Sequence, residues 1–372
     1  MKRILHIAKY YFPFRGGTEQ IAQDCVDSLV KYRQKVVCFN DETSNVKDKV
    51  DGVEIIRCGC FAKISSQPLS LSYGRILKSI IGSFKPDIVI FHYPNPFVAH
   101  YLLKYLPADT KFVLYWHLDI VKQKFLRRFF KSQNIKLLKR ADKVIATSSN
   151  YIKGSQWLNQ VKKKCVVIPN CINEQRLEKT AESKKIEKKI RKDNDGKIIC
   201  LAVGRHTEYK GFRYLIQASR FLDDRFRIYI TGKGRLTEEL EHEASGDNKI
   251  KFLGTVSDDE LKAYLSAMDI FCFPSISKNE AFGLALAEGM YYSKPAVTFT
   301  IDGSGVNYVS LNGITGIEVP NKDVKAYADA IKKLAADKEL REQYGINGRK
   351  RVIENFLDKQ FRENIRREIG SL

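Results

Sequence analysis

Two carboxylates lie close together in a segment that is otherwise apolar. Glu280 and Glu288 enclose the seven residues AFGLALA. A helix that is apolar on every side is normally buried, and a carboxylate is rarely buried without a partner. Either Glu288 therefore lies at a helix edge and meets water, or the two carboxylates meet a polar ligand.

Two cations follow a strand-like run in the second half of the chain. The run IICLAVG leads directly into a loop that contains Gly204, Arg205 and Lys210. Arginine offers a planar fork of N–H donors and lysine a compact charge, a combination that suits a pyrophosphate. The alternative is a pair of solvated loop cations. The position after a buried strand favours phosphate binding.

Two glycines, Gly16 and Gly17, follow the first strand-like run and precede a helix that we expect to begin near Thr18. Glycine lets backbone N–H groups approach an anion, and the start of a helix adds the positive end of its dipole. The pattern is not G-x-G-x-x-G, so the fingerprint of a dinucleotide-binding loop is absent. A phosphate contact at Gly17 and a plain strand-to-helix turn both stay open.

Three further positions also follow strand-like runs. His117 ends the run FVLYWH, and Asp119 lies close behind it. A single histidine after a strand is more often structural than functional, but this one would lie at the same edge of a sheet as the glycines. In the second half, Gly254 and Val256 follow the run IKFL. Their backbone could contact the flat edge of a nucleotide base.

These residues need elements that bring them together. Runs rich in Val, Ile and Phe alternate with segments of helical length, and they lack polar alternation, as strands buried on both faces should. Repeated strand–helix–strand units predict an α/β fold of two tandem Rossmann-like, doubly wound domains whose ligand-binding edges face one cleft. The expected strands are residues 2–8, 35–39, 53–57, 87–92, 111–117, 143–147, 165–169, 197–204, 226–232, 250–254, 269–274, 295–299 and 316–320.

The alternation is interrupted by a polar, highly charged segment at residues 173–195. We interpret this segment as the linker between the two domains. The predicted organisation is an N-terminal domain over 1–172, the linker, a C-terminal domain over 196–355, and a C-terminal helix over 356–372 that can cross back to the first domain.

The charge of the chain is large and uneven. The net charge is +21; residues 1–180 hold 31 Lys and Arg against 14 Asp and Glu, whereas residues 181–372 hold 33 against 29. The first half should therefore seek a polyanionic surface: nucleic acid, anionic lipid or a phosphorylated substrate. Eight cysteines, several of them inside apolar runs, indicate a reducing compartment. No apolar run is long enough to span a bilayer, and the N-terminus lacks a signal-peptide cleavage site.

Taken in order, these motifs resemble a known family. The sequence shows GG-T near the N-terminus, a histidine after a first-half strand, PN-x-I at 169–172, GR-x4-KG at 204–211 and E-x-FG-x4-E at 280–288. This combination resembles the family-4 type of retaining glycosyltransferases with the GT-B fold, and the resemblance spans nearly the whole chain. One departure is that PN is followed here by Cys171, Ile172 and Asn173, where family members often have G-I/V-D.

The resemblance implies a role for each matching residue. Arg205 and Lys210 would clamp the diphosphate of a nucleotide-sugar donor, and Gly17 would face it from the first domain. Glu288 would hold the ribose hydroxyl groups. Since these cations and a helix start can neutralise the leaving group, and no Asp-x-Asp motif stands at a strand end, we expect neither a metal nor a cofactor.

The resemblance also places the sugar. Glu280 would hydrogen-bond its hydroxyl groups, and His117 would lie over it near the anomeric carbon, so these two are the candidate catalytic residues. Backbone N–H groups would contact sugar and phosphate at Phe282, Gly283 and Leu284.

The expected function is a retaining hexosyltransferase of cell-surface polysaccharide assembly. The segment DGSGVNYVSLNGITGIEVP resembles the form found in bacterial enzymes of this class, including many mannosyltransferases, and favours GDP-mannose over UDP-sugars as the donor. The acceptor would be a glycan or a polyprenyl-diphosphate-linked sugar. Two alternatives remain: a basic nucleic-acid-binding protein, for which no zinc finger, RRM or helix-turn-helix pattern is present, and a GT-B enzyme such as a sugar-nucleotide epimerase, which lacks E-x7-E.

Residues 119–143 carry nine Lys or Arg, with a helical spacing of less polar side chains. This segment is either a core-packing helix with a solvated basic face or an interfacial helix that meets anionic lipid. The charge of the first half favours the membrane surface. We therefore expect a cytoplasmic protein, peripheral on the inner face of the cell membrane, without nucleic acid as a partner. The spaced side chains are Leu126, Phe129, Phe130, Gln133 and Leu137.

Overall fold

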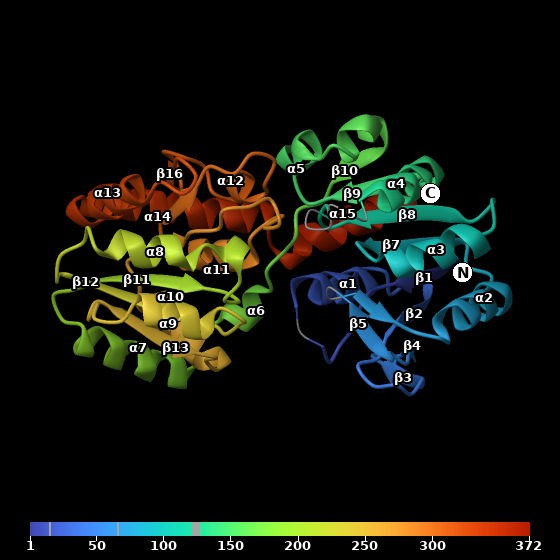
Figure 1. Ribbon diagram of the computed structural model, residues 1–372, viewed down its shortest axis with the longest axis horizontal. Coiled ribbons are helices and arrows are strands. Elements are labelled where there is room, and N and C mark those ends of the chain that lie inside the picture. The colour runs from blue at the N-terminus through green and yellow to red at the C-terminus, as the bar shows by residue number, and fades with distance from the viewer. Residues whose placement is uncertain (15, 65–66, 121–126) are drawn as a thin grey trace. The chain divides into compact units, whose positions relative to one another are not determined.

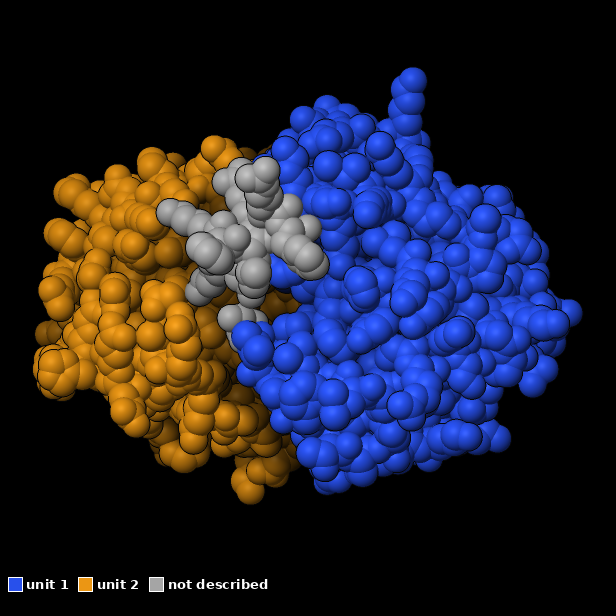
Figure 2. Space-filling model, turned by 45° about the vertical axis from the view of Figure 1, so that its right-hand side comes forward, with its two compact units in different colours: residues 1–170, 361–372 blue, residues 171–360 orange. Residues whose placement is uncertain are grey.

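The chain divides into two compact units, which are coloured separately in Figure 2. Unit 1 contains residues 1–170 and 361–372, and unit 2 contains residues 171–360. The computed structural model describes residues 1–14, 16–64, 67–120 and 127–372. Each unit is built around a predominantly parallel sheet with helices, so the expected α/β class with two Rossmann-like sheets is confirmed.

An eight-stranded sheet forms the centre of unit 1, in the order β10-β9-β8-β7-β1-β2-β4-β3. All neighbouring strands are parallel except β3, which runs antiparallel to β4. The central strands β1, β7 and β8 are buried except for the first residues of β1 and β8, which explains their unalternated apolar sequences. The strands are β1 (Arg3–Ile7), β2 (Arg33–Phe39), β3 (Val46–Val50), β4 (Val53–Cys58), β7 (Ile88–Tyr93), β8 (Lys111–Trp116), β9 (Lys143–Ala146) and β10 (Cys165–Val167).

Three strands of unit 1 have no counterpart in the sequence prediction. The first is β3, whose sequence VKDKV is largely exposed, as suits a charged edge strand. The other two form a separate antiparallel hairpin, β5 (Ala62–Ile64) and β6 (Gln67–Leu69). Apolar content predicts buried strands. A charged edge strand such as β3 and the short strands of a separate hairpin therefore give no such signal.

The helices of unit 1 lie between the strands of the sheet in sequence (Figure 1). The first turn of α3 is well specified, because the Asn95 side chain accepts from the N–H of Val98 and Pro96 occupies the first helical position. The helices are α1 (Gly17–Ser28), α2 (Tyr73–Phe84), α3 (Pro96–Tyr105), α4 (Arg127–Arg140), α5 (Ser149–Gly154), the 3-10 helix η1 (Leu158–Lys164) and most of α15 (Asp358–Gly370).

The last helix, α15, joins unit 1 from residue 361 onward. Its attachment is specific. Nζ of Lys143 lies 2.7 Å from the carboxylate of Glu368 and 2.9 Å from its carbonyl oxygen, and the Arg366 guanidinium donates to the carbonyl of Ser28. These polar contacts fix the C-terminal residues against β9 and the end of α1.

Unit 2 contains a fully parallel six-stranded sheet, in the order β13-β12-β11-β14-β15-β16, with helices on both faces (Figure 1). Its strands are β11 (Ile198–Val203), β12 (Phe226–Thr231), β13 (Ile250–Gly254), β14 (Ile270–Phe273), β15 (Ala296–Phe299) and β16 (Gly316–Val319). Its helices are α6 (Glu174–Leu177), α7 (Ala181–Asp193), η2 (Glu208–Lys210), α8 (Phe212–Ser219), α9 (Thr237–Glu243), α10 (Asp258–Ala267), α11 (Leu284–Tyr291), α12 (Val306–Val309), α13 (Val324–Ala336) and α14 (Lys338–Asn355).

The predicted linker at 173–195 differs from what the structure contains. These residues form α6 and α7 and belong to unit 2, where α7 packs on α10. Ile190 of α7 lies in the hydrophobic core of unit 2, and Ile186 packs against this core. Polar contacts add to this packing: the Ser266 hydroxyl of α10 donates to Glu187 at 2.6 Å, and the Arg191 guanidinium lies 3.1 Å from the Asp269 carboxylate. Because α7 buries only a narrow stripe of its surface, its composition resembles that of a solvated connection.

Candidate active site

The predicted site residues of unit 2 lie at one edge of its sheet. Arg205 and Lys210 follow β11, Gly254 ends β13, and Glu280 lies in the loop after β14. β11 is paired with β14 on one side and with β12 on the other, and β12 in turn is paired with β13. Parallel strands bring their carboxyl ends to the same edge, so the sheet gathers residues that are far apart in the sequence.

Lys210 and Glu280 form an ion pair at this edge. Nζ lies 2.5 Å from Oε2, and each side chain is 11% exposed. The Ser275 hydroxyl donates to the same carboxylate oxygen at 3.2 Å, and Nζ lies 5.0 Å from the centre of the Phe273 ring. A buried charge is costly unless it is paired, so each of the two residues holds the other in a defined position.

Two glycines let the loop of Lys210 approach the segment after β14. Gly211 has a φ of +65°, and a Cβ there would lie 2.1 Å from the carbonyl oxygen of Pro274. Gly204 has a φ of +154°, and a Cβ there would lie 3.2 Å from Cε of Lys210. Residues with a Cβ rarely adopt these φ values. Gly211 is therefore required by the close packing of two loops, and Gly204 by its own φ and by the Lys210 side chain beside it.

Helix α11 begins directly behind Glu280. Its N-cap is Gly283, with a φ of +96°. Within the described part of the chain, the N–H groups of Phe282, Gly283 and Leu284 have no hydrogen-bond acceptor. Free N–H groups at a helix start favour an anion, so α11 and Lys210 offer donors and positive charge at the same edge.

The loop before α12 supports this arrangement from behind. The Ser304 hydroxyl donates to the carbonyl oxygen of Glu280 at 2.5 Å and accepts from the N–H of Val306. A Cβ at Gly305 would lie only 2.0 Å from the carbonyl oxygen of Ala281. Residues 304 and 305 thus fix the backbone that carries Glu280.

Glu288 lies one turn into α11 and is partly buried. Burial raises the pKa of its carboxyl to about 7, whereas the positive charges of Arg176 and Lys210 act in the opposite direction. Among the residues that the structure describes, none forms an ion pair or hydrogen bond with this side chain. The carboxyl is therefore a largely desolvated group that retains its hydrogen-bonding capacity.

At the end of β13, the two predicted base-contact residues differ in what they can offer. The Gly254 carbonyl already accepts from the N–H of Gly232 at 2.8 Å and from the Thr231 hydroxyl at 2.9 Å. Its two lone pairs are thus occupied. The backbone groups of Val256 have no partner within the described ranges, so Val256 is the member of the pair that can meet a ligand.

In unit 1, β8 brings His117 to the carboxyl edge of the sheet. Its N–H donates to the carbonyl of Tyr93, and its ring stacks on Tyr115 with 4.5 Å between the ring centres. Nε2 lies 3.0 Å from Nδ1 of His92. Burial lowers the pKa of His117 to about 3, so the ring is a neutral imidazole at physiological pH. It can exchange hydrogen bonds with a hydroxyl group but cannot neutralise a phosphate.

The segment after His117 is held by a buried carboxylate. The Trp116 indole N–H donates to Oδ1 of Asp119 at 2.9 Å, and the Ser155 hydroxyl donates to the same oxygen at 2.8 Å. The N–H of Asp119 bonds the Tyr151 hydroxyl oxygen at 2.6 Å. Asp119, which the sequence placed near the site, therefore orders the loop.

Gly17 is the first residue of α1, after an extended Gly16. The loop before it is anchored by Arg57, a buried side chain of β4 that donates to the carbonyls of Tyr11 at 3.3 Å and Phe12 at 2.5 Å. Gly17 and His117 belong to unit 1, whereas the remaining predicted site residues belong to unit 2.

Residues that the sequence analysis missed support the predicted ones. Ser275 holds Glu280, and Arg176 acts on Glu288. Their sequence surroundings carry no signal for these roles, because each contact depends on a different loop. His92 is different: it follows the apolar run DIVIF just as His117 follows FVLYW, so this repetition could have revealed it.

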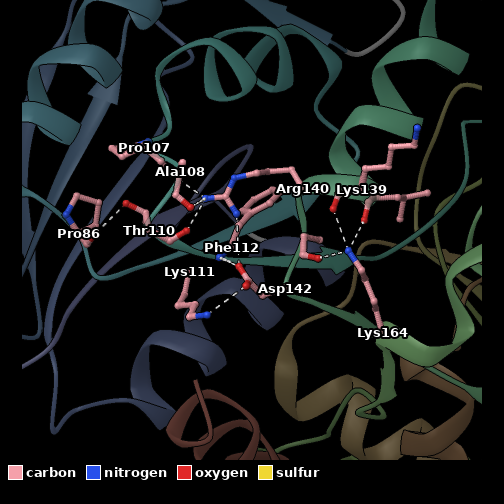
Figure 3. Close-up of polar contacts among 12 residues, drawn as sticks. Pro86, Pro107, Ala108, Thr110, Lys111, Phe112, Lys139, Arg140, Asp142 and Lys164 are labelled. Carbon is pink, nitrogen blue, oxygen red and sulfur yellow. Dashed lines mark hydrogen bonds and ion pairs between the residues drawn. The ribbon is translucent and has the colours of Figure 1, made fainter.

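The end of the basic segment 119–143 has a structural function (Figure 3). The Arg140 guanidinium donates to the carbonyl oxygens of Pro107 at 2.8 Å and Thr110 at 2.5 Å. Nζ of Lys164 donates to the last carbonyl groups of α4 and to that of Ala141 at 2.7 Å. Cations commonly satisfy the final carbonyls of a helix in this way. These two cations therefore complete the backbone of unit 1.

The hypothesis that residues 119–143 form a helix inserted into lipid is corrected for α4 from Phe130 onward, where the structure describes the side chains. Leu137 and Leu138 are buried, and the Gln133 side chain donates to the carbonyl of Pro96 at 2.9 Å. This face belongs to the core and is not available to insert into lipid. Leu126 and the rest of 121–126 lie outside the described residues. The exposed side of the helix carries Lys131, Lys136 and Lys139.

No helix within the described ranges combines the length and the hydropathy needed to cross a membrane.

Comparison with known proteins identifies the family of the chain. Residues 15–176 match the family model for Glycosyltransferase Family 4, and residues 182–351 match the model for Glycosyl transferases group 1. O-antigen chain mannosyltransferase C of Escherichia coli is 29% identical over 361 residues, which are 95% of this chain and 94% of the relative. D-rhamnosyltransferase WbpZ of Pseudomonas aeruginosa is 28% identical over 360 residues, 95% of this chain and 92% of the relative.

Solved structures give the same fold. Sucrose-phosphate synthase from Thermosynechococcus elongatus has a TM-score of 0.80 at 18% identity, covering 100% of this chain and 99% of its own. WaaG, a glycosyltransferase involved in lipopolysaccharide biosynthesis, has a TM-score of 0.71 at 14% identity and covers 98% of both chains. The protein has the GT-B fold. It belongs to the family-4 type of GT-B glycosyltransferases, which decides against the epimerase alternative.

Proposed function

We propose that the protein transfers a hexosyl group from a nucleotide-sugar to a glycan or lipid-diphosphate-linked acceptor, with retention of configuration, during assembly of a cell-surface polysaccharide. Two relatives match along almost the whole chain, an O-antigen mannosyltransferase and a D-rhamnosyltransferase, and they support this assignment. The first relative favours GDP-mannose as the donor. A UDP-sugar is the second candidate, since the structural neighbour HepE was solved with UDP and glucose.

The observation that carries the proposal is the Lys210–Glu280 pair beside the free N–H groups of α11. In glycosyl transfer, the bond between the anomeric carbon and a phosphate oxygen breaks, and the nucleoside diphosphate leaves with additional negative charge. Lys210, Arg205 and the α11 N–H groups would stabilise this charge. Glu280 would hold hydroxyl groups of the sugar that remains.

The remaining predicted residues complete the proposed site. Glu288 would bind the ribose hydroxyls, and Val256 would contact the base. From unit 1, the Gly17 N–H would approach the diphosphate and neutral His117 would contact the sugar. The acceptor hydroxyl would attack the anomeric carbon from the leaving-group face and give its proton to the departing phosphate oxygen, which retains the configuration.

The proposal predicts catalysis without a metal. The positive charge near the leaving group is provided by side chains and backbone N–H groups, so transfer should continue in excess EDTA. Complete loss of transfer, with recovery on addition of Mg²⁺ or Mn²⁺, would contradict this part of the proposal.

A donor screen tests the function directly. Purified protein is incubated with GDP-mannose, UDP-glucose and related donors and with glycan or polyprenyl-diphosphate-linked acceptors, and the anomeric configuration of the product is read by NMR. Transfer from one donor class with retention is expected. Release of nucleoside diphosphate without an extended acceptor, or a product of inverted configuration, would contradict the proposal.

Calorimetry tests the phosphate site separately. Arg205→Ala and Lys210→Ala should each weaken binding of the preferred nucleoside diphosphate by ~1.5–3 kcal/mol, the range for charge-assisted hydrogen bonds. Lys251→Ala, an exposed cation on β13, is the matched control and should bind as the wild type does. Unchanged binding in both site variants would remove these residues from the site.

We also propose that unit 1 contacts an anionic membrane surface from the cytoplasmic side through exposed lysines, without insertion of α4 and without nucleic acid as a partner. The excess of positive charge in the first half and the exposed side of α4 support this contact. Association that depends on charge alone should be reversible with salt.

A further inference from the structure

The loop that follows β12 in unit 2 has not been assigned to the site. β12 ends at Thr231, and the segment Gly-Lys-Gly follows at 232–234. The pairing register places Val203 of β11 beside Thr231, and Thr231 beside Gly254 of β13. The three strands therefore end at one level, and the loop after β12 lies between the loops after β11 and β13.

This loop is tied to the loop after β11. Nδ1 of the buried His206 lies 2.9 Å from the Thr237 hydroxyl, which donates to the carbonyl oxygen of Gly234 at 2.8 Å. The N–H of His206 donates to the Lys233 carbonyl at 3.2 Å. A Cβ at Gly234 would lie only 2.4 Å from the carbonyl oxygen of His206. Lys233 therefore projects from a backbone that is fixed against the loop of Arg205.

The Lys233 side chain is directed toward β13. A Cβ at Gly254 would lie 3.2 Å from Cε of Lys233 and 4.0 Å from its Nζ. Gly254 has a φ of +66°, and its carbonyl accepts from the N–H of Gly232 at 2.8 Å. The glycine thus makes room for the stem of the lysine. The ammonium group lies at the end of β13, beside the backbone that leads to Val256.

The charge of Lys233 is not neutralised by a neighbour. The side chain is exposed, and it has no ion pair or hydrogen bond within the part of the chain that the structure describes. Two nearby cations differ in this respect: Arg235 lies 3.5 Å from the Glu208 carboxylate, and Lys210 lies 2.5 Å from that of Glu280. The donors of Lys233 are therefore available to a ligand at the end of β13.

This position is remote from the phosphate end of the proposed site. Lys210 and Glu280 meet where β11 lies beside β14, whereas Lys233 reaches β13, which is two strands beyond β11. Neighbouring strands lie about 4.8 Å apart, so the two positions are separated by roughly 10–15 Å. A nucleotide whose diphosphate lies at Lys210 would place its base, and not a phosphate, beside Lys233.

An ammonium group distinguishes bases because it donates hydrogen bonds and cannot accept them. Guanine presents two neighbouring acceptors, O6 and N7, and the O4 carbonyl oxygen of a pyrimidine such as uracil is likewise an acceptor. Adenine and cytosine have an amino group in place of this carbonyl, and the amino group is itself a donor. Contact with such an amino group would leave both donors without an acceptor, which is unfavourable.

We propose that Lys233 is a specificity-determining residue, which donates to the base of the donor nucleotide and selects guanine or uracil over adenine or cytosine. The inference rests on the proposed function, which places a nucleotide at this edge of the sheet. It adds a side chain to the base contact, for which the backbone of Val256 is the other candidate.

Calorimetry with nucleoside diphosphates tests the selection without an acceptor or an assay of transfer. IDP and ADP differ at one ring carbon, which carries a carbonyl oxygen in IDP and an amino group in ADP, and UDP and CDP differ in the same way. In the pair whose ring size the site accepts, the full-length protein should bind the carbonyl member roughly tenfold more tightly, as expected for one charge-assisted hydrogen bond. A ratio near one would overturn the proposal.

Three variants assign the selection to one side chain. Lys233→Met keeps the stem on Gly254 but removes the donors, so the ratio should fall to near one through weaker binding of the carbonyl member. Lys233→Arg keeps the donors and should retain most of the ratio. The control is Arg235→Met, in the same loop, where the side chain is paired with Glu208, and it should behave as the wild type does. Equal losses for both members in Lys233→Met would assign Lys233 to the phosphates and overturn the proposal.

Sugar transfer by the same variants separates this inference from the proposed function. Transfer by a protein whose base preference is unchanged in Lys233→Met would support the function and overturn the role of Lys233. A base preference that Lys233→Met abolishes, in a protein that transfers no sugar from any donor, would support the role of Lys233 and contradict the proposed function.

Discussion

The carboxyl edges of the two sheets bury polar side chains in different ways. In unit 2 the buried groups are charged, and Lys210 and Glu280 neutralise each other as an ion pair. In unit 1 three buried histidines, His6, His92 and His117, are kept uncharged by burial, although the carboxylate of Asp119 is also buried close to this edge. Similar parallel strands thus provide an edge suited to phosphate charge in one unit and an edge suited to hydroxyl groups in the other.

The three histidines of unit 1 and Glu288 of unit 2 also respond to pH in opposite directions. A histidine with a lowered pKa takes up its proton only in the unfolded chain once the pH falls below about 6.5, so acid destabilises unit 1. Glu288 has a raised pKa of about 7. Its proton is retained in the folded chain above pH 4.5 but lost from the unfolded chain, so stability from this group falls as the pH rises from about 4.5 to 7.

The largest expected effect is the acid response of unit 1. Between pH 7.5 and pH 5, each of the three buried histidines should reduce the free energy of unfolding by about 2 kcal/mol. Both tryptophans, Trp116 and Trp157, belong to unit 1, so their fluorescence in urea titrations reports on this unit. His6→Gln should flatten the pH dependence, whereas His100→Gln should not. A free energy of unfolding that stays constant down to pH 5 would contradict the conclusion that burial keeps the three histidines of unit 1 uncharged.

The next effect concerns the charged side of the comparison. Lys210→Met leaves the Glu280 carboxylate buried without its partner, and loss of one member of a buried pair costs about 3–5 kcal/mol. Adding Glu280→Gln should restore most of this stability. Lys251→Met, at an exposed position on β13, should have little effect. Chemical unfolding followed by circular dichroism measures all four proteins, and equal stability of the single and double variants would contradict the pairing.

A smaller effect is expected from the second carboxylate of unit 2. Glu288→Gln should stabilise the protein by about 2 kcal/mol at pH 8, because the folded chain no longer has to hold a desolvated charge. The gain should vanish near pH 4.5, where the wild-type carboxyl is protonated. Unfolding curves at several pH values measure this difference, with the exposed Glu339→Gln as the control. If the gain in stability were the same at every pH, it would come from side-chain packing and not from the removal of a desolvated charge.

The smallest effect per residue concerns the surface charge of the units. Replacing Lys131, Lys136 and Lys139 by Gln should weaken binding to vesicles with anionic lipid by about 1 kcal/mol for each lysine. The effect should disappear at high salt, where screening is strong. Three exposed lysines of unit 2 that have acidic neighbours serve as the control: Lys325, Lys332 and Lys338. Equal losses in both triple variants would show that unit 1 has no special affinity for the membrane.

The strands were predictable because apolar content is a local property. Each of the thirteen predicted runs overlaps a strand of the structure. The sequence is less informative where most side chains are polar. β3 is a charged edge strand, and α7 is a charged helix that buries Ile190 in the core of unit 2. A segment with so few buried side chains has nearly the composition of a solvated one, so its composition alone does not separate the two.

The candidate site shows the same contrast between features that local sequence predicts and contacts that it does not. The motifs that contain Glu280, Glu288, Arg205 and Lys210 could be predicted from local sequence, because each motif follows its own strand. The pairing of Lys210 with Glu280 could not, since this contact depends on β11 lying beside β14. The hydrogen bond between His92 and His117 depends in the same way on the register of β7 beside β8. Hydrogen bonds between segments that are distant in the sequence set this register, and no local pattern predicts it.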